Sequence, residues 1–395
     1  MIATDKITPS RTPKQLRLAN AVFFFLSGFG YSSWASRIPT IKHQLHLNEA
    51  QLGGILFAMP VGLLLTLPLT GKLLSKYSSR RIMLFGGLFF SVVLACIGFA
   101  ANVWQLVLVL FCFGVSRNLF NISTNAQAVA VQALYERSIM ANFHGIWSLA
   151  GFAGAAVGYF MVYYNIGTNY HLLGVSILLV VFSLWFIKGT IYQAPVPQVK
   201  KKLFTLPDKS LLNFALICFA SMACENTMYD WSGIYFEKVI HVSKATATEG
   251  FVVYMIAMTL GRFVGDAGVN RFGIKNLLRF SGIFICSGLL LAVLMPYTIT
   301  AIIGFILVGL GVSCIVPMVF QMAGKSTTMS SGTALAAISS IGYLGFLIVP
   351  PFIGFIAQVA GLRVSFGLIS LLGALVAVLV YKIKEDNTKP TNNPA

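Results

Sequence analysis

A succession of apolar segments separated by short polar gaps is the feature that most restricts how this chain can fold. One helix needs about 20 apolar residues to cross a bilayer, and segments of that size occur twelve times. They cover approximately residues 16–38, 52–74, 82–101, 104–131, 140–164, 171–187, 211–236, 248–269, 277–295, 298–322, 334–359 and 364–381. Because a helix satisfies its own backbone hydrogen bonds in lipid, we expect an all-α membrane protein with twelve transmembrane helices.

The scarcity of charge supports this expectation. Only 10% of the 395 residues are charged, whereas a soluble domain carries about 25% charged residues. The net charge of +17 would suggest nucleic-acid binding in a soluble protein. Here the basic residues fall in the gaps between apolar segments, where the positive-inside rule places them. We therefore expect the lipid bilayer, and no nucleic acid, as a partner.

The same basic residues predict the orientation. If the N-terminus is cytoplasmic, most of the 28 lysine and arginine residues fall on the cytoplasmic side. The residues left on the opposite side are Arg37, Lys42, Lys238, Lys244 and Arg363. The polar, basic start of the chain has no evident cleavable signal sequence. We predict a multi-pass protein of the cell (inner) membrane with both termini in the cytoplasm.

A polar connection divides the chain near its middle. Residues 188–210 form the longest polar stretch between two spans and include several prolines and a run of lysines. We interpret this stretch as a cytoplasmic linker. It would join an N-terminal six-helix bundle, residues 1–187 with a tail at 1–15, to a C-terminal six-helix bundle, residues 211–395 with a tail at 382–395.

The two halves repeat. Tyr31 and Trp34 near the end of the first span are mirrored by Tyr229 and Trp231 near the end of the seventh. A basic turn follows each pair at a nearly equal offset. A repeat of six spans predicts two pseudo-symmetric bundles with a solute cavity at their interface.

Several stretches resemble the major facilitator superfamily. Residues 71–81 are similar to its loop 2–3 motif, usually GxLxDRxGRR, with Ser75 at the acidic position and Lys76 at the first arginine. Residues 270–273 resemble the second copy. The stretches around Asn125, Phe143, Glu225 and Gly342 resemble the YbjJ-type, fucose-permease-related branch of the superfamily. This resemblance implies a twelve-helix fold, alternating access and a cavity lined mainly by helices 1, 4, 7 and 10, but no particular substrate.

In that superfamily the loop 2–3 motif forms charge contacts between the halves. The resemblance therefore makes a set of charged residues candidates for gating: Lys76, Arg80, Arg262, Asp266 and Arg271. Ser75 removes the acid from the first copy, so Asp266 with Arg262 or Arg271 is the better pair. The alternative is a solvated loop that only obeys the positive-inside rule.

Charged residues inside a span are costly, by about 2.5–3.5 kcal/mol on insertion scales, and usually face a cavity or a partner. Arg117 lies within the fourth span, with Asn121 and Asn125 following at helical spacing. This stripe offers guanidinium and amide groups that suit a carboxylate, a phosphate or sugar hydroxyls. The alternative is an arginine that bonds only to backbone carbonyls.

Three further ionisable residues are candidates for proton coupling. Glu225 and Asp230 lie in the seventh span, and His144 opens the fifth. A carboxylate removed from water is easier to protonate, so Glu225 is the first candidate. We expect it to pair with Arg117 when the site is empty and to separate when a solute is bound. Asp230 lies nearer the outer surface, where it would be hydrated, and His144 could instead bond to a backbone carbonyl.

Aromatic and amide side chains complete the candidate solute site. They are Tyr31, Trp34, Tyr229, Trp231, Tyr343 and Gln321. Aromatic faces with a few polar groups would suit a sugar or a small amphiphile. The alternative for each ring is packing, or a place in an interfacial aromatic belt.

Other chemistries lack their motifs. No P-loop pattern occurs, which disfavours ATP-driven pumping. No HExxH motif occurs, and His144 has no local partner arrangement of the kind an intramembrane enzyme would need. All six cysteines lie in apolar segments and none forms a CxxC pair. We expect no enzyme activity, metal or cofactor.

The sequence therefore predicts a secondary active transporter. It would move a small polar solute, sugar-like or a small anionic metabolite, by alternating access, with protons as a candidate coupling ion. The alternative is proton-driven efflux of drugs or amphiphilic metabolites, which the abundant aromatic residues allow. A pore or receptor-like protein is a further alternative, distinguished by unsaturable flux or none. We expect a monomer.

Overall fold

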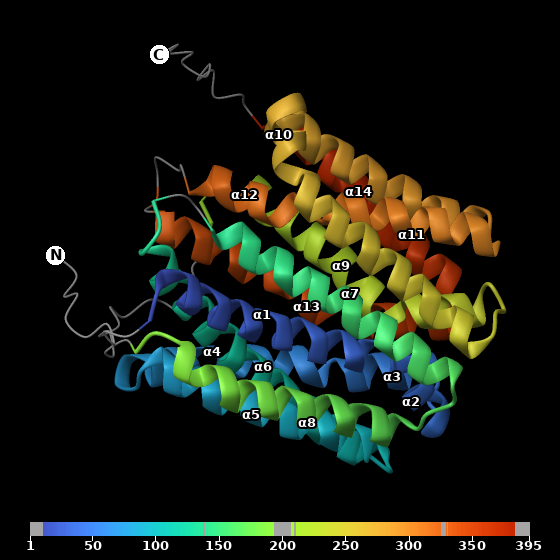
Figure 1. Ribbon diagram of the computed structural model, residues 1–395. Helices are drawn as coiled ribbons and strands as arrows, with labels where there is room; N and C mark the ends of the chain where they lie inside the picture. Colours follow the sequence, from blue (N-terminus) through green and yellow to red (C-terminus); the bar gives the residue numbers. More distant parts are fainter. Residues whose placement is uncertain are drawn as a thin grey trace.

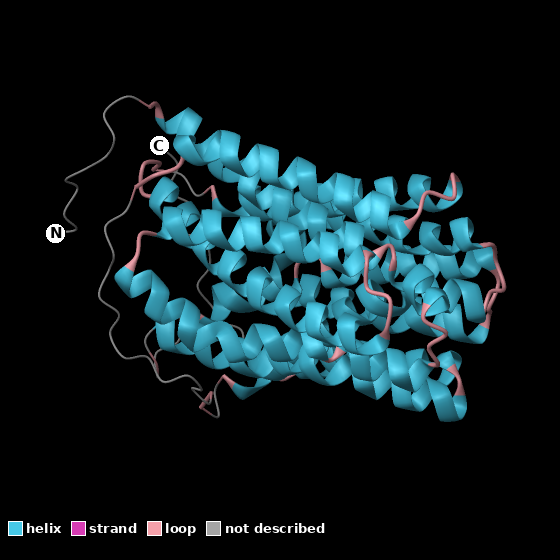
Figure 2. Ribbon diagram, turned by 90° about the horizontal axis from the view of Figure 1, so that it is seen from below, coloured by secondary structure: helices cyan, strands magenta, loops and turns pink. Residues whose placement is uncertain are grey.

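The computed structural model describes residues 11–136, 139–192, 207–208, 211–324, 329 and 331–383. Every regular element among these residues is a helix, as Figure 2 shows. The helices run along one another in a single elongated bundle (Figure 1). Their bounds are α1 Pro13–Ala35, α2 Ile38–Gln44, α3 Glu49–Leu56, α4 Ala58–Lys76, α5 Ser79–Gly98, α6 Val103–Gln132, α7 Met140–Tyr163, α8 Thr168–Phe186, the 3-10 turn η1 Ile187–Gly189, α9 Leu212–Lys238, α10 Lys244–Leu294, α11 Thr298–Val312, α12 Ile315–Ala323, α13 Ser331–Ala360 and α14 Leu362–Tyr381.

The helices account for twelve crossings, as the apolar segments predicted. Ten segments of the described chain are helical and both long and apolar enough to cross a membrane. Two of them lie in α10, which bends at Gly273, where φ is +76° and only glycine fits without strain. Helices α3 and α4 together form one span, as do α11 and α12. The other two crossings are α1 and α9.

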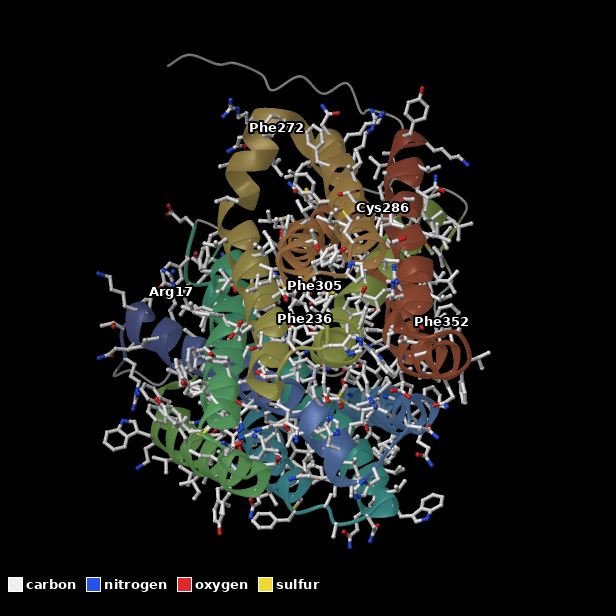
Figure 3. All side chains as sticks on the ribbon, turned by 90° about the vertical axis from the view of Figure 1, so that its right-hand side faces the viewer. Arg17, Phe236, Phe272, Cys286, Phe305 and Phe352 are labelled. Carbon is white, nitrogen blue, oxygen red and sulfur yellow. The ribbon has the colours of Figure 1, made fainter. Side chains whose placement is uncertain are left out.

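Helices α1 and α9 are the most polar of the long helices because they face protein rather than lipid. In α9, every residue from Ala220 to Phe236 is buried. Figure 3, which looks along the bundle, places Phe236 of α9 and Phe305 of α11 among the helices, whereas Phe352 and Phe272 lie near the edge. A helix enclosed by others keeps Asn, Glu and Asp side chains out of lipid.

The bundle has two ends. Helix α1 begins at the left-hand end in Figure 1, which we call the terminal face. Helix α2 lies at the right-hand end, which we call the α2 face. Much of the predicted linker at 188–210 and most of both tails lie outside the described residues.

Two helix pairs join the halves: α3 packs against α13, and α7 against α10. A Cβ added to Gly53 would stand 2.5 Å from the carbonyl oxygen of Pro350, and one added to Gly354 would stand 2.6 Å from that of Glu49. These distances are too short for any side chain. The two helices therefore touch backbone to backbone near the α2 face.

Helix α2 adds further contacts between the halves. Pro39 lies against Gly233, where an added Cβ would stand 2.9 Å from the proline Cγ. The His43 ring pairs with the carboxylate of Glu237 at the end of α9. The α2 face is thus closed by direct contact between the first and second halves.

Candidate solute site between the two halves

A cavity lies between the halves, walled by four helices. Its residues are Met59, Pro60, Leu63 and Leu64 of α4, Arg117 of α6, Asn226 of α9, and Tyr343 and Phe346 of α13. The atom-free space inside it is about 320 Å³, its open mouth included. The walls come from the second, fourth, seventh and eleventh crossings, rather than from helices 1, 4, 7 and 10.

Among the described residues, Arg117 is the only charged side chain on the cavity wall. Its guanidinium carbon lies over the ring of Tyr31 of α1, 3.8 Å from the ring centroid. The Tyr31 ring in turn contacts Tyr229 of α9, with centroids 5.1 Å apart. No ion pair reaches Arg117 within the described chain. A stacked row of side chains thus runs from α6 through α1 to the second half.

The two asparagines of the predicted stripe do not line the cavity. Asn125 donates from Nδ2 to Oδ1 of Asn121 at 2.8 Å and to its backbone carbonyl at 2.9 Å. Asn121 is exposed. Each step of four residues turns a helix by about 40° beyond a full circle, so the stripe leaves the cavity as it approaches the terminal face. Among the three predicted residues only Arg117 reaches the wall.

Glu225 has a different partner from the one the sequence suggested. The expected pair with Arg117 is wrong in this conformation, because Glu225 Oε1 lies 3.7 Å from Nη2 of Arg262. Sequence positions give the depth of a residue in the membrane but not the direction it faces. Helices α9 and α10 are neighbours in one half, and this brings Arg262 close to Glu225.

Arg262 links three helices around Glu225. Its Nη1 donates to the Ser148 hydroxyl of α7, across the interface between the halves, and its Nε donates to the Ser313 carbonyl at 3.4 Å. Thr259, one turn away, donates to the Ser148 carbonyl at 3.1 Å. Arg262 was a candidate for pairing with Asp266, whose side chain lies outside the described part of the structure. The described contacts of its guanidinium include Glu225 and Ser148.

Asp230 is buried, contrary to the expectation of a hydrated site near the outer surface. Only 2% of it is exposed. Its Oδ2 accepts a hydrogen bond of 2.9 Å from Asn226. Asp230 lines a second, narrower cavity toward the α2 face with Ser36, Pro39 and Thr248 among others. Asn226 thus lines the first cavity and donates to a carboxylate that lines the second.

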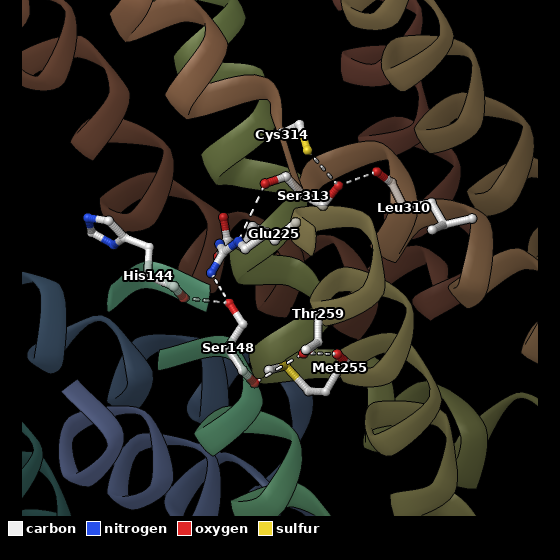
Figure 4. Close-up of polar contacts among 9 residues, drawn as sticks. His144, Ser148, Glu225, Met255, Thr259, Leu310, Ser313 and Cys314 are labelled. Atoms are coloured by element: carbon white, nitrogen blue, oxygen red, sulfur yellow. Dashed lines mark hydrogen bonds and ion pairs between the residues drawn. The ribbon is translucent and has the colours of Figure 1, made fainter. Parts of the chain in front are cut away.

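The remaining ionisable candidates lie away from both cavities. The His144 ring packs edge-on against Phe24 and, in Figure 4, points away from Glu225. Lys76 is exposed at the end of α4, and Arg80 is half-buried in the first turn of α5. Arg271 lies over the Phe272 ring at 5.5 Å. No ion pair within the described chain joins these basic residues to the other half.

Some of the aromatic and amide candidates line a cavity, and others do not. Tyr343 lines the first cavity, and Tyr229 lines the second. Trp34 and Trp231 are fully buried and line neither cavity. Gln321 is exposed near the end of α12. Both tryptophans belong to the buried core, and the rings of Trp34 and Phe113 pack at 67° to each other.

Comparison with known proteins establishes the family. The profile of the Major Facilitator Superfamily matches residues 21–331 and 251–395. The chain belongs to the major facilitator superfamily. This MFS protein is 32% identical to an uncharacterized MFS-type transporter of Yersinia pestis over 361 residues, which span 91% of this chain and 94% of that one.

Two further comparisons are consistent with membership of this superfamily. This MFS transporter is 22% identical to the inner membrane transport protein YdhP of Escherichia coli K12 over 376 residues, 92% of this chain and 93% of that one. Its fold matches the crystal structure of the nucleoside transporter NupG with a TM-score of 0.75 at 13% identity, covering 93% and 99% of the two chains. The protein is thus a multi-pass secondary transporter and not an enzyme.

Proposed function

We propose that this MFS transporter carries a small polar solute, sugar-like or a small anion, through the cavity at Arg117 and Asn226. The observation that supports this most is that one guanidinium and one amide, from opposite halves, face the same cavity. A solute held by both groups would join the halves only while it is bound. Such a contact is what alternating access requires. We place the chain in the fucose-permease-related, YbjJ-type branch.

Segments 1–187 and 211–395 are proposed to be the moving halves, joined by 188–210 and working as a monomer. The distribution of basic residues supports a cytoplasmic position for the terminal face and for both tails, in a cell whose inner membrane holds the protein. The described conformation then faces inward. Contacts between the halves close the α2 face, while Asn121, beyond Arg117 toward the terminal face, is exposed.

Glu225 is the proposed proton-coupling residue. Its carboxylate faces Arg262, and Arg262 bonds to Ser148 of the opposite half. A proton on Glu225 would remove the charge that holds Arg262 in place. Breaking one partner of a buried ion pair has a large free-energy cost, so protonation and movement of α7 against α10 are linked.

Glu225→Gln is expected to abolish proton-driven accumulation while solute exchange continues, because a glutamine keeps the shape of the side chain but cannot titrate. The measurement compares uptake driven by a pH gradient with counterflow in proteoliposomes. Glu49→Gln, which changes a carboxylate paired with Lys42 near the α2 face, is the control and should accumulate solute normally. Uphill uptake by Glu225→Gln at the wild-type level would remove Glu225 from the coupling mechanism.

A second candidate function is efflux of amphiphiles, because Met59, Leu63, Leu64 and Phe346 make much of the cavity wall apolar. The two functions differ in direction. In inverted membrane vesicles, efflux would appear as proton-driven accumulation of amphiphiles. An importer would instead release preloaded solute when the gradient is imposed.

A further inference from the structure

We propose that the solute is a small organic monoanion with an apolar body, held at its anionic group by Arg117 and moved together with a proton. This inference rests on the proposed transport function and narrows its solute class from sugar-like or anionic to anionic.

The positive charge of Arg117 has no ionic partner within the described chain. The Tyr31 ring is its close contact, and a cation over an aromatic ring gains only about 0.5–2 kcal/mol. The two carboxylates of this region have other partners: Glu225 faces Arg262, and Asp230 accepts from Asn226. A guanidinium presents five N–H donors in a planar fork that matches a carboxylate. An anion in the cavity would supply the partner that the protein does not.

The cavity wall has few hydrogen-bonding side chains. Of the described residues that line it, only Arg117, Asn226 and Tyr343 have polar side chains, and the other five are apolar. Each hydroxyl that loses water without a new partner costs about 1–3 kcal/mol. A polyol has more hydroxyls than this wall can satisfy. One anionic group on a compact apolar body fits it better.

The charges of the ionisable side chains around the cavity favour a proton as the companion of the anion. Two guanidiniums, Arg117 and Arg262, and two carboxylates, Glu225 and Asp230, lie at this level, and four ionised groups sum to zero. The other titratable side chains near them are the phenols of Tyr31, Tyr229, Tyr254 and Tyr343 and the imidazole of His144. A bound monoanion would leave one uncompensated negative charge out of water, which is costly. One proton on either carboxylate restores neutrality. This proton is released together with the anion on the other side of the membrane.

Binding is tested with the purified full-length protein and matched probes. Phenylacetate and isovalerate are compared with phenylacetamide and isovaleramide, and with glucose, myo-inositol and uridine, by thermal stabilisation. We expect a carboxylate to bind at least tenfold more tightly than its amide. Arg117→Gln should erase this preference and Arg117→Lys should keep part of it. Arg279→Gln, at an exposed site outside the cavity, should keep all of it.

Transport of the best probe then tests the proton. In proteoliposomes a pH gradient should drive its accumulation, and a membrane potential alone should not, because one anion with one proton carries no net charge. Saturable counterflow of glucose, myo-inositol or uridine, with no carboxylate bound, would overturn the inference and leave the transport function standing. Binding of a carboxylate without preference over its amide would also overturn it. Counterflow of none of the probes would overturn both.

Discussion

Arg117→Ala is expected to lower kcat/KM for the transported solute by about 100-fold or more. The change removes the one charge on the cavity wall and its charge-assisted hydrogen bonds, each worth about 1.5–3 kcal/mol. A 100-fold loss corresponds to about 2.7 kcal/mol, since each factor of ten is about 1.4 kcal/mol. Initial rates of uptake over a range of solute concentrations measure it.

Arg117→Lys separates charge from shape. Lysine keeps the positive charge but loses the planar fork of donors, so we expect an intermediate loss of kcat/KM. Arg279→Gln removes one positive charge from an exposed site outside the cavity and should transport normally. Wild-type kinetics in Arg117→Ala would show that the cavity at Arg117 lies off the solute route.

Gly53→Ala is expected to destabilise the closed α2 face by about 1–3 kcal/mol, the usual effect of forcing extra atoms into a packed site. An added Cβ would stand 2.5 Å from a backbone oxygen of α13 and 2.9 Å from the Cα of Gly354. Backbone atoms cannot turn aside as a flexible side chain can. Helices α3 and α13 would have to separate, which lowers the melting temperature and favours opening at the α2 face.

Gly54→Ala is a close control for this change. It lies next in the same helix, and a Cβ there meets nothing within 4 Å. Alanine is favoured over glycine in a helix by about 1 kcal/mol, so Gly54→Ala should equal or exceed the wild-type melting temperature. Equal melting temperatures for Gly53→Ala and Gly54→Ala would mean that the halves do not touch at this point in the membrane.

The fold was predictable because length and polarity are read directly from the sequence. Each apolar segment had the length of one crossing, and α1 and α9 were recognised although they are less apolar than the rest. Gly273 within α10 also lies in a predicted turn. The breaks between α3 and α4 and between α11 and α12 were not predicted, since no polar gap marks them.

The site was predictable only where a charge stood inside a span. Arg117 was found in this way because an arginine in lipid needs a cavity or a partner. The partner of Glu225 was not found, because spacing along two helices gives their depth and not which faces meet. Leu63, Leu64 and Phe346 were missed for another reason: an apolar residue that lines a cavity has the same sequence pattern as one that packs in a core.

Transport by this route requires that the cavity at Arg117 be open to water and solute from the terminal face. Leu63→Cys, on its wall, in a variant with the six native cysteines replaced, tests this directly. In sealed vesicles we measure modification by a charged, membrane-impermeant thiol reagent from each side. Reaction from the cytoplasmic side, slowed by bound solute, is the predicted result. A thiol that reacts from neither side, with or without solute, would contradict the account, because Arg117 would then face a dry interior.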